Sequence, residues 1–369
     1  MTQRPLALVA TACTLALAGC SAGTDETSAD EPVTVYVSLP LRGLSGTDGR
    51  DGADGARLAL AEAGGVAGDH EVQAEYLDDT DGPPRAARWS PSKAAENART
   101  ATQDSSAIAY LGDFESGATR SSLPITNEAR MLQVSPASAA SDLVREPGTF
   151  DDVPEELQPS GERTFGRVIP SDQAQAEAGA QWASELGARS VTVREDRSAF
   201  GEALGEAFVL AAESLGLAVG RSDQAELTYL AGAPDLSGGR QMGSDLFFSI
   251  PSGQPPLVTS AALDPSQLPP TGQEFVGRFR NEYGRRPGRY AAYGYEAMAV
   301  VLDSIERAGD EGADREAVID AFFDTSDRDS VLGTYSIDEV GETTLDRITG
   351  YRLVGDRAEP VAELSSSDG

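Results

Sequence analysis

Short apolar runs alternate along this chain with longer segments in which an apolar residue recurs at every third or fourth position. The run at 33–39 predicts a strand, and the spacing over 53–63 predicts a helix that ends at Gly64 and Gly65. A further strand is predicted at 72–77. A strand, a helix and a strand in this order predict a parallel sheet.

The same alternation continues to residue 134 and resumes beyond a loop at 146–162, which is rich in proline, glycine and acidic residues. We therefore expect an α/β fold with two doubly wound parallel-sheet lobes. Helices are predicted over 94–102, up to 128, and over 174–186, 200–215, 275–283 and 297–305. Strands are predicted at 108–111, 131–134, 190–193, 227–230 and 246–250, with a strand pair around Tyr335 and 351–354.

The N-terminus has the pattern of an export signal. Arg4 precedes an apolar run at 6–18, which is too short to remain as a membrane-spanning helix. The sequence Leu-Ala-Gly-Cys that ends at Cys20 resembles the lipobox of bacterial lipoproteins, in which the cysteine is lipidated and becomes the first residue. We expect residues 1–19 to be removed as the signal peptide and the polar segment 20–32 to be a disordered tether.

Charge and cysteine content narrow the partners and the chemistry. The sequence has 29 basic and 60 acidic residues, a formal net charge of −31, which disfavours nucleic acid and anionic membrane surfaces as partners. Cys13 leaves with the signal peptide, so after processing no cysteine is left for disulfides, thiolate catalysis or a zinc site. We expect no cofactor, no metal and no enzyme activity.

Motifs spread over nearly the whole mature chain occur at 33–41, 55–60, 76–79, 110–119, 134–138, 165–172, 196–201, 284–287, 293–297 and 333–338. Together they resemble one family, the type I periplasmic binding proteins, and within it the group that binds branched-chain amino acids, amides and urea for ABC importers. The resemblance implies two lobes joined by three crossovers, which close on one small polar ligand of amino acid or amide type. It further implies a monomer that delivers this ligand to ABC permease subunits, anchored through Cys20 to the outer face of the cell membrane.

The lobe boundaries follow by analogy with that family. Lobe 1 is expected to contain 33–145 and 258–332, and lobe 2 to contain 146–257 and 333–362, followed by a disordered tail at 363–369.

The resemblance also implies a ligand site at the loops of the first lobe. In such proteins a ligand carboxylate is held by hydroxyl groups and by backbone N–H groups at helix N-termini, where peptide dipoles favour negative charge. Ser116 and Ser138 match the hydroxyl positions, although Ser116 is alternatively only the N-cap of the following helix. The backbone contacts carry over to Gly117, Ala118, Ala137 and Ala139.

Three further side chains match the family's site, each with an alternative interpretation. Asp172 matches an acid near the ligand ammonium, or it is the N-cap of the helix over 174–186. Phe200 covers an apolar group of the ligand, or it belongs to the core. Asp48 favours a ligand amine, or it is a solvated loop acid.

The sequence departs from the family in two places. Ala139 stands where branched-chain amino acid binders often have a threonine, and the stretch between Leu217 and Leu246 is shorter than usual, so a helix is missing from it. Asp235 and Asp245 are the candidates for the second-lobe carboxylate. These departures leave two alternatives to transport, namely a ligand sensor and a cell-surface interaction protein with the same fold.

The sequence gives only weak support for an enzyme or a metal site. Ser90 and Lys93 satisfy a Ser-x-x-Lys spacing but lack the accompanying motifs of penicillin-recognising enzymes. Asp48, Asp51 and Asp54 lack the alternating ligands of a calcium loop, so we interpret them as acids that favour a helix N-terminus. The single histidine, His70, supports neither a catalytic triad nor a metal site.

Overall fold

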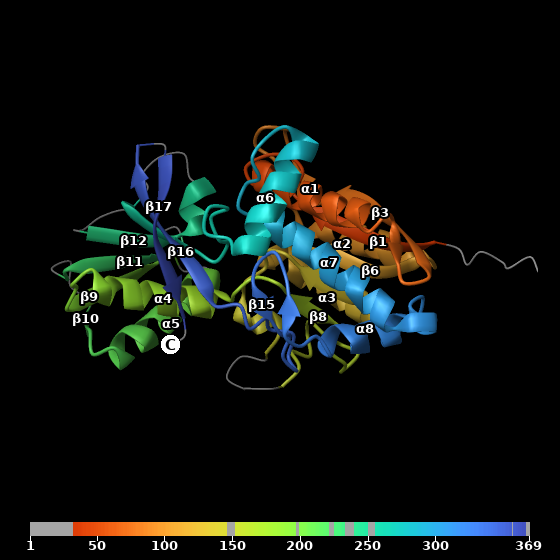
Figure 1. Ribbon diagram of the computed structural model, residues 1–369. Coiled ribbons are helices and arrows are strands. Elements are labelled where there is room, and N and C mark those ends of the chain that lie inside the picture. The colour runs from red at the N-terminus through yellow and green to blue at the C-terminus, as the bar shows by residue number, and fades with distance from the viewer. Residues whose placement is uncertain are drawn as a thin grey trace, which may run out of the picture. The chain divides into compact units, whose positions relative to one another are not determined.

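The structure is a computed structural model, which describes residues 32–145, 152–196, 199–220, 225–232, 240–249, 255–355 and 357–366 (Figure 1). The predicted signal peptide, Cys20 and Asp235 lie outside the described residues, and Phe200 is described only as a position in a helix. Within the described ranges, no helix has the length and apolar character that crossing a membrane requires.

The first sheet has six strands in the order β2-β3-β1-β6-β7-β8, and every pairing except that of β2 with β3 is parallel. Helix α1 packs against α7, and α2 packs against α3. Right-handed crossovers place these two helix pairs on opposite faces of the sheet. The strands are β1 Val33–Leu39, β2 Val66–Ala67, β3 His70–Asp78, β6 Ala107–Gly112, β7 Leu132–Ser135 and β8 Phe165–Arg167. The helices are α1 Gly46–Glu62, α2 Pro91–Gln103, α3 Ser116–Glu128, α6 Pro270–Tyr283, α7 Ala291–Arg307 and α8 Arg315–Phe323.

The second sheet has seven strands in the order β10-β9-β11-β12-β13-β16-β17, of which β16 and β17 are antiparallel to their neighbours. Helices α4 Asp172–Glu185 and α5 Ala199–Ser214 pack against each other and against this sheet. Phe208 of α5 stacks on Tyr229 of β11, with 3.8 Å between ring centroids. The strands are β9 Ser190–Glu195, β10 Ala218–Gly220, β11 Leu227–Ala231, β12 Arg240–Ser244, β13 Leu257–Ser260, β16 Arg347–Val354 and β17 Arg357–Ser365.

The remaining elements are short and connect these layers. They are the strands β4 Thr80–Asp81, β5 Arg88–Trp89, β14 Arg328–Asp329 and β15 Thr334–Tyr335, and the 3₁₀ turns η1 Ser141–Leu143, η2 Asp245–Ser249 and η3 Gly309–Glu311.

Strand pairing moves three of the expected boundaries. Because β8 pairs with β7, the first crossover between the sheets follows Arg167 instead of lying near residue 145. Strand β13 keeps the chain in the second sheet as far as Ser260, beyond the expected boundary at 257. Residues 363–365, expected in a disordered tail, belong to β17, where Leu364 packs into the core.

The predicted strand at 246–250 is wrong, because residues 245–249 form η2 and the strand lies earlier, at β12. A short apolar run does not distinguish a buried strand from a buried helical turn. Here Phe247 is buried against Leu230, Val258 and Tyr351, which a single helical turn accomplishes.

The connections on either side of β11 are short. Only residues 221–226 separate β10 from β11, and only 232–239 separate β11 from β12. Parallel strands are usually joined by a crossover of a dozen or more residues, so both connections are shorter than usual. In β11, Leu227 and Tyr229 join the core cluster with α5, and the intervening Thr228 faces away from it.

Candidate ligand-binding site

In both sheets the loops at the carboxyl ends of parallel strands gather at one edge, where open α/β sheets bind their ligands. From the first sheet these loops follow β1, β6 and β7, and from the second sheet they follow β12 and β13. The predicted residues Asp48, Ser116, Ser138 and Asp245 all come from these loops or from the first residues beyond them.

Glu115 has an unpaired buried oxygen at this edge. It is the N-cap residue of α3, yet its side chain makes no capping hydrogen bond. Ser45 Oγ donates to Glu115 Oε1 at 2.7 Å, whereas Oε2 is buried and has no partner within the described ranges. Burial raises the pKa of the Glu115 carboxyl to about 7, and the negative charges of Asp113 and Asp48 act in the same direction.

Arg289, in the loop before α7, is the cation of the site. Its side chain is 16% exposed, and Nη2 makes one long contact of 3.4 Å with Asp48 Oδ2. Nη1 is buried and has no partner in the described part of the chain. The guanidinium lies 3.9 Å from the centroid of the Phe248 ring, so a first-lobe arginine touches a second-lobe aromatic residue.

Asp245 also joins the two lobes, from the start of η2. Tyr290 Oη donates to its Oδ2 at 3.3 Å, and Ser260 Oγ donates to the same oxygen at 3.0 Å. Gln175 Nε2 lies 3.4 Å from Oδ1. All three of these donors are neutral, so the carboxylate is hydrogen-bonded without being ion-paired to them.

Aromatic rings surround the first turn of α3. Phe114 and Tyr290 meet edge to face, with 4.5 Å between centroids. Trp89 of β5 packs against Gly117, where an added Cβ would lie 2.5 Å from Trp89 Cη2. Only glycine fits at position 117 without displacing this ring.

The predicted first-lobe contacts are placed as follows. Ser116 is the first residue of α3 and its Oγ accepts from Ala140 N at 3.1 Å, so it is not the N-cap. The N–H of Ala118 already donates to the carbonyl of Glu115 at 2.9 Å. Ser138 is fully buried, with its hydroxyl 2.6 Å from Thr119 Oγ1. A ligand contact by the Ser138 hydroxyl therefore stays a prediction, and it requires this bond to rearrange.

The predicted contacts next to the crossover are also engaged with protein groups. Ala139 accepts at its carbonyl from Asp172 N at 2.9 Å, and the half-buried Ala137 donates from its N–H to Ser135 Oγ at 3.1 Å. The buried Asp172 carboxylate accepts from Ser141 Oγ at 2.7 Å. The N-cap of α4 is Ser171, so the capping interpretation of Asp172 is wrong.

The residues of the enzyme and metal patterns make contacts within the protein. Lys93 pairs with Glu96 at 2.7 Å, and Ser90 is the N-cap residue of α2. Arg285 binds both Asp51 and Asp54. In the part of the chain that the structure describes, no group of three or more histidine, cysteine, aspartate or glutamate side chains is arranged to hold a metal ion.

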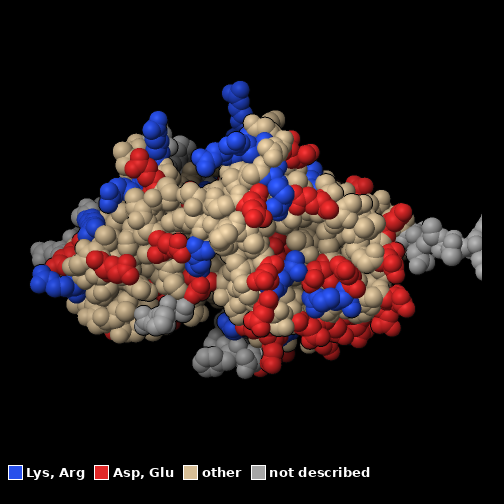
Figure 2. Space-filling view, viewed as in Figure 1, with Lys and Arg blue, Asp and Glu red and all other residues tan. Residues whose placement is uncertain are grey.

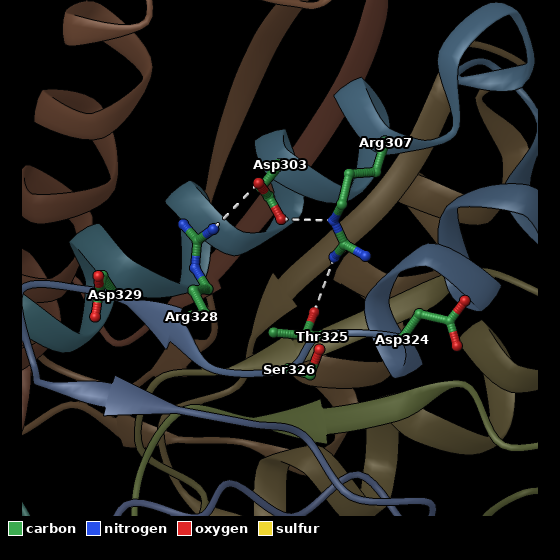
Figure 3. Close-up of a pocket in the computed structure, with 7 residues that line it drawn as sticks. All are labelled: Asp303, Arg307, Asp324, Thr325, Ser326, Arg328 and Asp329. Carbon is green, nitrogen blue, oxygen red and sulfur yellow. Dashed lines mark hydrogen bonds and ion pairs between the residues drawn. The ribbon is translucent and has the colours of Figure 1, made fainter.

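A second polar cluster lies at the far end of α7, around a cavity of about 310 Å³ (Figure 3). Arg307 bonds Asp303 at 2.8 Å and Thr325 Oγ1 at 2.9 Å. Arg328 bonds Asp303 at 3.3 Å and the buried Glu296 at 2.7 Å. Both guanidinium groups are thus satisfied by protein groups, which indicates a structural network. The cavity is lined by Asp303, Arg307, Asp324, Thr325, Ser326, Arg328 and Asp329.

Sequence reasoning missed Glu115, Arg289, Tyr290 and Trp89 as site residues. One signal for Glu115 was present, an acid directly before the first turn of a helix in a loop already assigned to the ligand. Arg289 gave no such signal, because it lies in a polar loop and is buried by Phe248, which is distant in the sequence.

Comparison with known proteins identifies the same architecture. A family model described as periplasmic binding protein matches residues 32–237. A leucine-binding protein from Thermotoga maritima is 22% identical, with a TM-score of 0.72, and the match covers 90% of this chain and 99% of that one. An ABC transporter substrate-binding protein from Desulfitobacterium hafniense, solved with leucine, is 20% identical, with a TM-score of 0.71 and coverage of 90% and 100%.

A third solved relative binds a different kind of molecule. A solute-binding protein from Rhodopseudomonas palustris, in complex with 3,4-dihydroxybenzoic acid, is 16% identical, with a TM-score of 0.68 and coverage of 91% and 98%. Comparison with curated protein sequences finds no match.

Proposed function

The chain belongs to the periplasmic binding protein family, and on this premise we propose that it is an extracytoplasmic binding protein that captures a small polar ligand and delivers it to an ABC importer. The ligand class is of amino acid or amide type, and the protein acts as a monomer. The observation that carries the proposal is a pair of buried polar atoms, Glu115 Oε2 and Arg289 Nη1, which have no partner among the described residues and lie at the carboxyl ends of the parallel strands. Buried polar groups normally have partners, and a ligand supplies them here.

Contacts between the lobes support a mechanism of capture by closure. Arg289 and Tyr290 belong to the first lobe, whereas Phe248 and Asp245 belong to the second. A ligand that bonds to residues of both lobes stabilises the arrangement in which they touch, and hinge closure around a ligand is a common switching motion. The permease then distinguishes loaded from empty protein by the arrangement of the two lobes.

Solved relatives support the ligand class without fixing it. Two of them are a leucine-binding protein and a protein solved with leucine, and another was solved with an aromatic acid. Ala139 and the short connections of the second sheet argue that the ligand of this chain differs from leucine.

The test is a thermal-shift screen of the purified protein against neutral, acidic and basic amino acids, amides, amines and aromatic acids. A ligand at one hundred times its Kd stabilises the folded protein by about 2.7 kcal/mol, enough to raise Tm by several degrees. Calorimetry on each hit measures the stoichiometry, expected to be one. If folded, ligand-free protein responds to no compound, the binding function is contradicted and the interaction-protein alternative gains support.

Export and anchoring are proposed from the sequence. Removal of residues 1–19, lipidation of Cys20 and a tether at 20–32 would hold the folded part at the outer face of the membrane. Full-length protein expressed in a bacterial host should incorporate labelled fatty acid and sediment with membranes, and Cys20→Ser should abolish both. Equal labelling and sedimentation of the two proteins would overturn the anchor.

A further inference from the structure

Among the carboxylates of the ligand loops, Glu115 has neither a basic partner nor a hydrogen bond to its second oxygen within the described ranges. Asp113 is buried but accepts from Ser38 at 3.0 Å and from Tyr110 at 3.2 Å, and Asp245 accepts from Tyr290 and Ser260. Asp48 faces Arg289. Glu115 has only the Ser45 hydroxyl, and no lysine or arginine contacts it among the described residues. A buried carboxylate without a counter-charge is costly, so Glu115 calls for a cation from outside the protein.

A second buried acid, Asp79, interacts electrostatically with Glu115. Asp79, just after β3, is completely buried, and neither of its carboxylate oxygens has a partner within the described ranges. Burial raises the pKa of Asp79 to about 9, and the charges of Asp113, Glu115 and Asp78 add to this effect. Asp79 is therefore protonated near pH 7, which indicates that this edge of the first sheet accommodates negative charge poorly.

The first turn of α3 is consequently a poor place for an anion. A ligand carboxylate at Ser116 would lie next to the Glu115 carboxylate, and like charges at close range in a buried site repel strongly. The N–H groups of Ala118 and Thr119 both donate to the Glu115 carbonyl already. This edge of α3 suits a positively charged group instead, opposite to the carboxylate position that the family resemblance implies.

Aromatic residues fit a cation at this position as well. Phe114 is the neighbour of Glu115 and lies against Tyr290, and Trp89 covers Gly117. The faces of such rings attract ammonium groups, most strongly where water is excluded.

Arg289 provides the other end of the site. Nη1 is a buried donor with no partner in the described part of the chain, and the planar guanidinium suits a carboxylate or carbonyl oxygen. Two contacts bring the ends of the site together. Asp48 contacts Arg289 directly, and Phe114, the neighbour of Glu115, lies against Tyr290, the neighbour of Arg289.

We infer that the ligand is a small organic cation with net positive charge, that Glu115 binds its ammonium group and that Arg289 donates to an oxygen acceptor elsewhere in the molecule. This inference rests on the proposed function and narrows its ligand class. The overall charge of the protein favours such a ligand, since acidic side chains are distributed widely over the face shown in Figure 2 and the formal net charge is −31. A field of this sign raises the local concentration of cations.

Calorimetry with five probes tests the inference. L-lysine, L-ornithine and L-arginine are cations with a carboxylate, whereas L-leucine is neutral overall and L-glutamate is anionic. The basic amino acids should bind more tightly than leucine, and glutamate should not bind. Glu115→Gln should weaken lysine binding at least about thirty-fold, as expected for removing one partner of a buried charge pair.

Two further comparisons keep this test independent of folding and of net charge. Glu128→Gln removes the same charge from an exposed position at the other end of α3 and should leave affinity within about twofold. Putrescine has two ammonium groups and no oxygen, so Arg289→Gln should weaken binding of lysine but not of putrescine. Circular dichroism confirms that each variant is folded.

The outcomes separate the two proposals. If no compound of any class binds, the proposed function fails and the inference falls with it. If only neutral or anionic compounds bind, or if Glu115→Gln leaves lysine binding unchanged, the binding function stands and the inference is overturned.

Discussion

Two polar clusters of this protein contain similar groups but differ in how completely the groups are paired. In the α7 network, formed by Glu296, Asp303, Arg307, Thr325 and Arg328, each guanidinium has two protein partners at 3.3 Å or less. In the ligand cluster, formed by Asp48, Glu115, Asp245, Arg289 and Tyr290, the ion pair of Arg289 is long. Two buried polar atoms of this cluster have no partner among the residues that the structure describes.

This difference separates a structural role from a binding role. A fully paired network stabilises the fold and gains nothing from a ligand, even where a cavity adjoins it. A cluster with unpaired buried atoms costs stability in the empty protein and regains it when a ligand arrives. Active and binding sites commonly lower the stability of the empty protein in this way.

The largest expected effect is in the α7 network. Arg328→Gln should lower the free energy of unfolding by about 3 kcal/mol, because it leaves the buried Glu296 carboxylate without its cation. Denaturant unfolding measures the loss, and ligand affinity should be unchanged. Arg307→Gln is the matched control, with an expected loss of less than about 1 kcal/mol, because its ion pair is a third exposed. Equal losses in the two variants would contradict the distinction between buried and exposed pairs.

Removing a charge from the ligand cluster should raise the free energy of unfolding instead of lowering it. Burial raises the pKa of Glu115 to about 7, so above this pH the folded protein holds an ionised carboxylate that the unfolded chain ionises more easily. Glu115→Gln should therefore stabilise the ligand-free protein at pH 8 by about 1–2 kcal/mol. Denaturant unfolding of both proteins at pH 8 checks this, and a less stable variant would show that Glu115 is structural.

The pH dependence of stability gives a smaller and complementary signal. Between about pH 4.5 and pH 7 the folded state binds the Glu115 proton more tightly than the unfolded state does. The Glu115 contribution to stability should therefore decline as pH rises through this range and then level off. Asp113 and Asp79, whose pKa values burial raises to about 6 and about 9, act in the same direction, and Asp48 faces the same edge. The difference between wild type and Glu115→Gln isolates Glu115, and parallel profiles would refute its assignment.

Affinity for a cationic ligand should rise with pH, whereas the Glu115 contribution to stability declines. The ionised form of Glu115 binds the ammonium group, so affinity should rise with pH by up to about tenfold per unit below pH 7. Calorimetry with L-lysine from pH 5 to pH 8 measures this rise. Glu115→Gln should flatten the profile, whereas Arg289→Gln should lower it without changing its shape.

Local patterns were enough to predict the α/β architecture. Apolar residues at three- and four-residue steps located α1, α4 and α5, and β-branched runs located β1 and β9. These signals depend on near neighbours in the sequence. Strand pairing does not, so the assignment of β8 to the first sheet could be read only from the structure.

The candidate site was harder to predict for the same reason. Asp48 was predicted because it follows the expected strand at 33–39. Asp245 was only a candidate for the second-lobe carboxylate, placed before a predicted strand at 246–250 that the structure does not contain. The burial of Arg289 depends on Phe248, and the unpaired state of Glu115 depends on which groups surround it in space. Ser138 was predicted from its motif, but its hydroxyl already bonds to Thr119 and to the carbonyl of Asp113. The motif alone could not reveal these partners.

The most direct test of the account is proton release on ligand binding. A cation that pairs with Glu115 should lower the pKa of that carboxyl and release up to about one proton near pH 6.5. Calorimetry of L-lysine binding in two buffers of different ionisation heat counts these protons. The account predicts a buffer-dependent heat that disappears in Glu115→Gln and persists in Glu128→Gln. Tight binding with the same heat in both buffers would contradict the central role of Glu115.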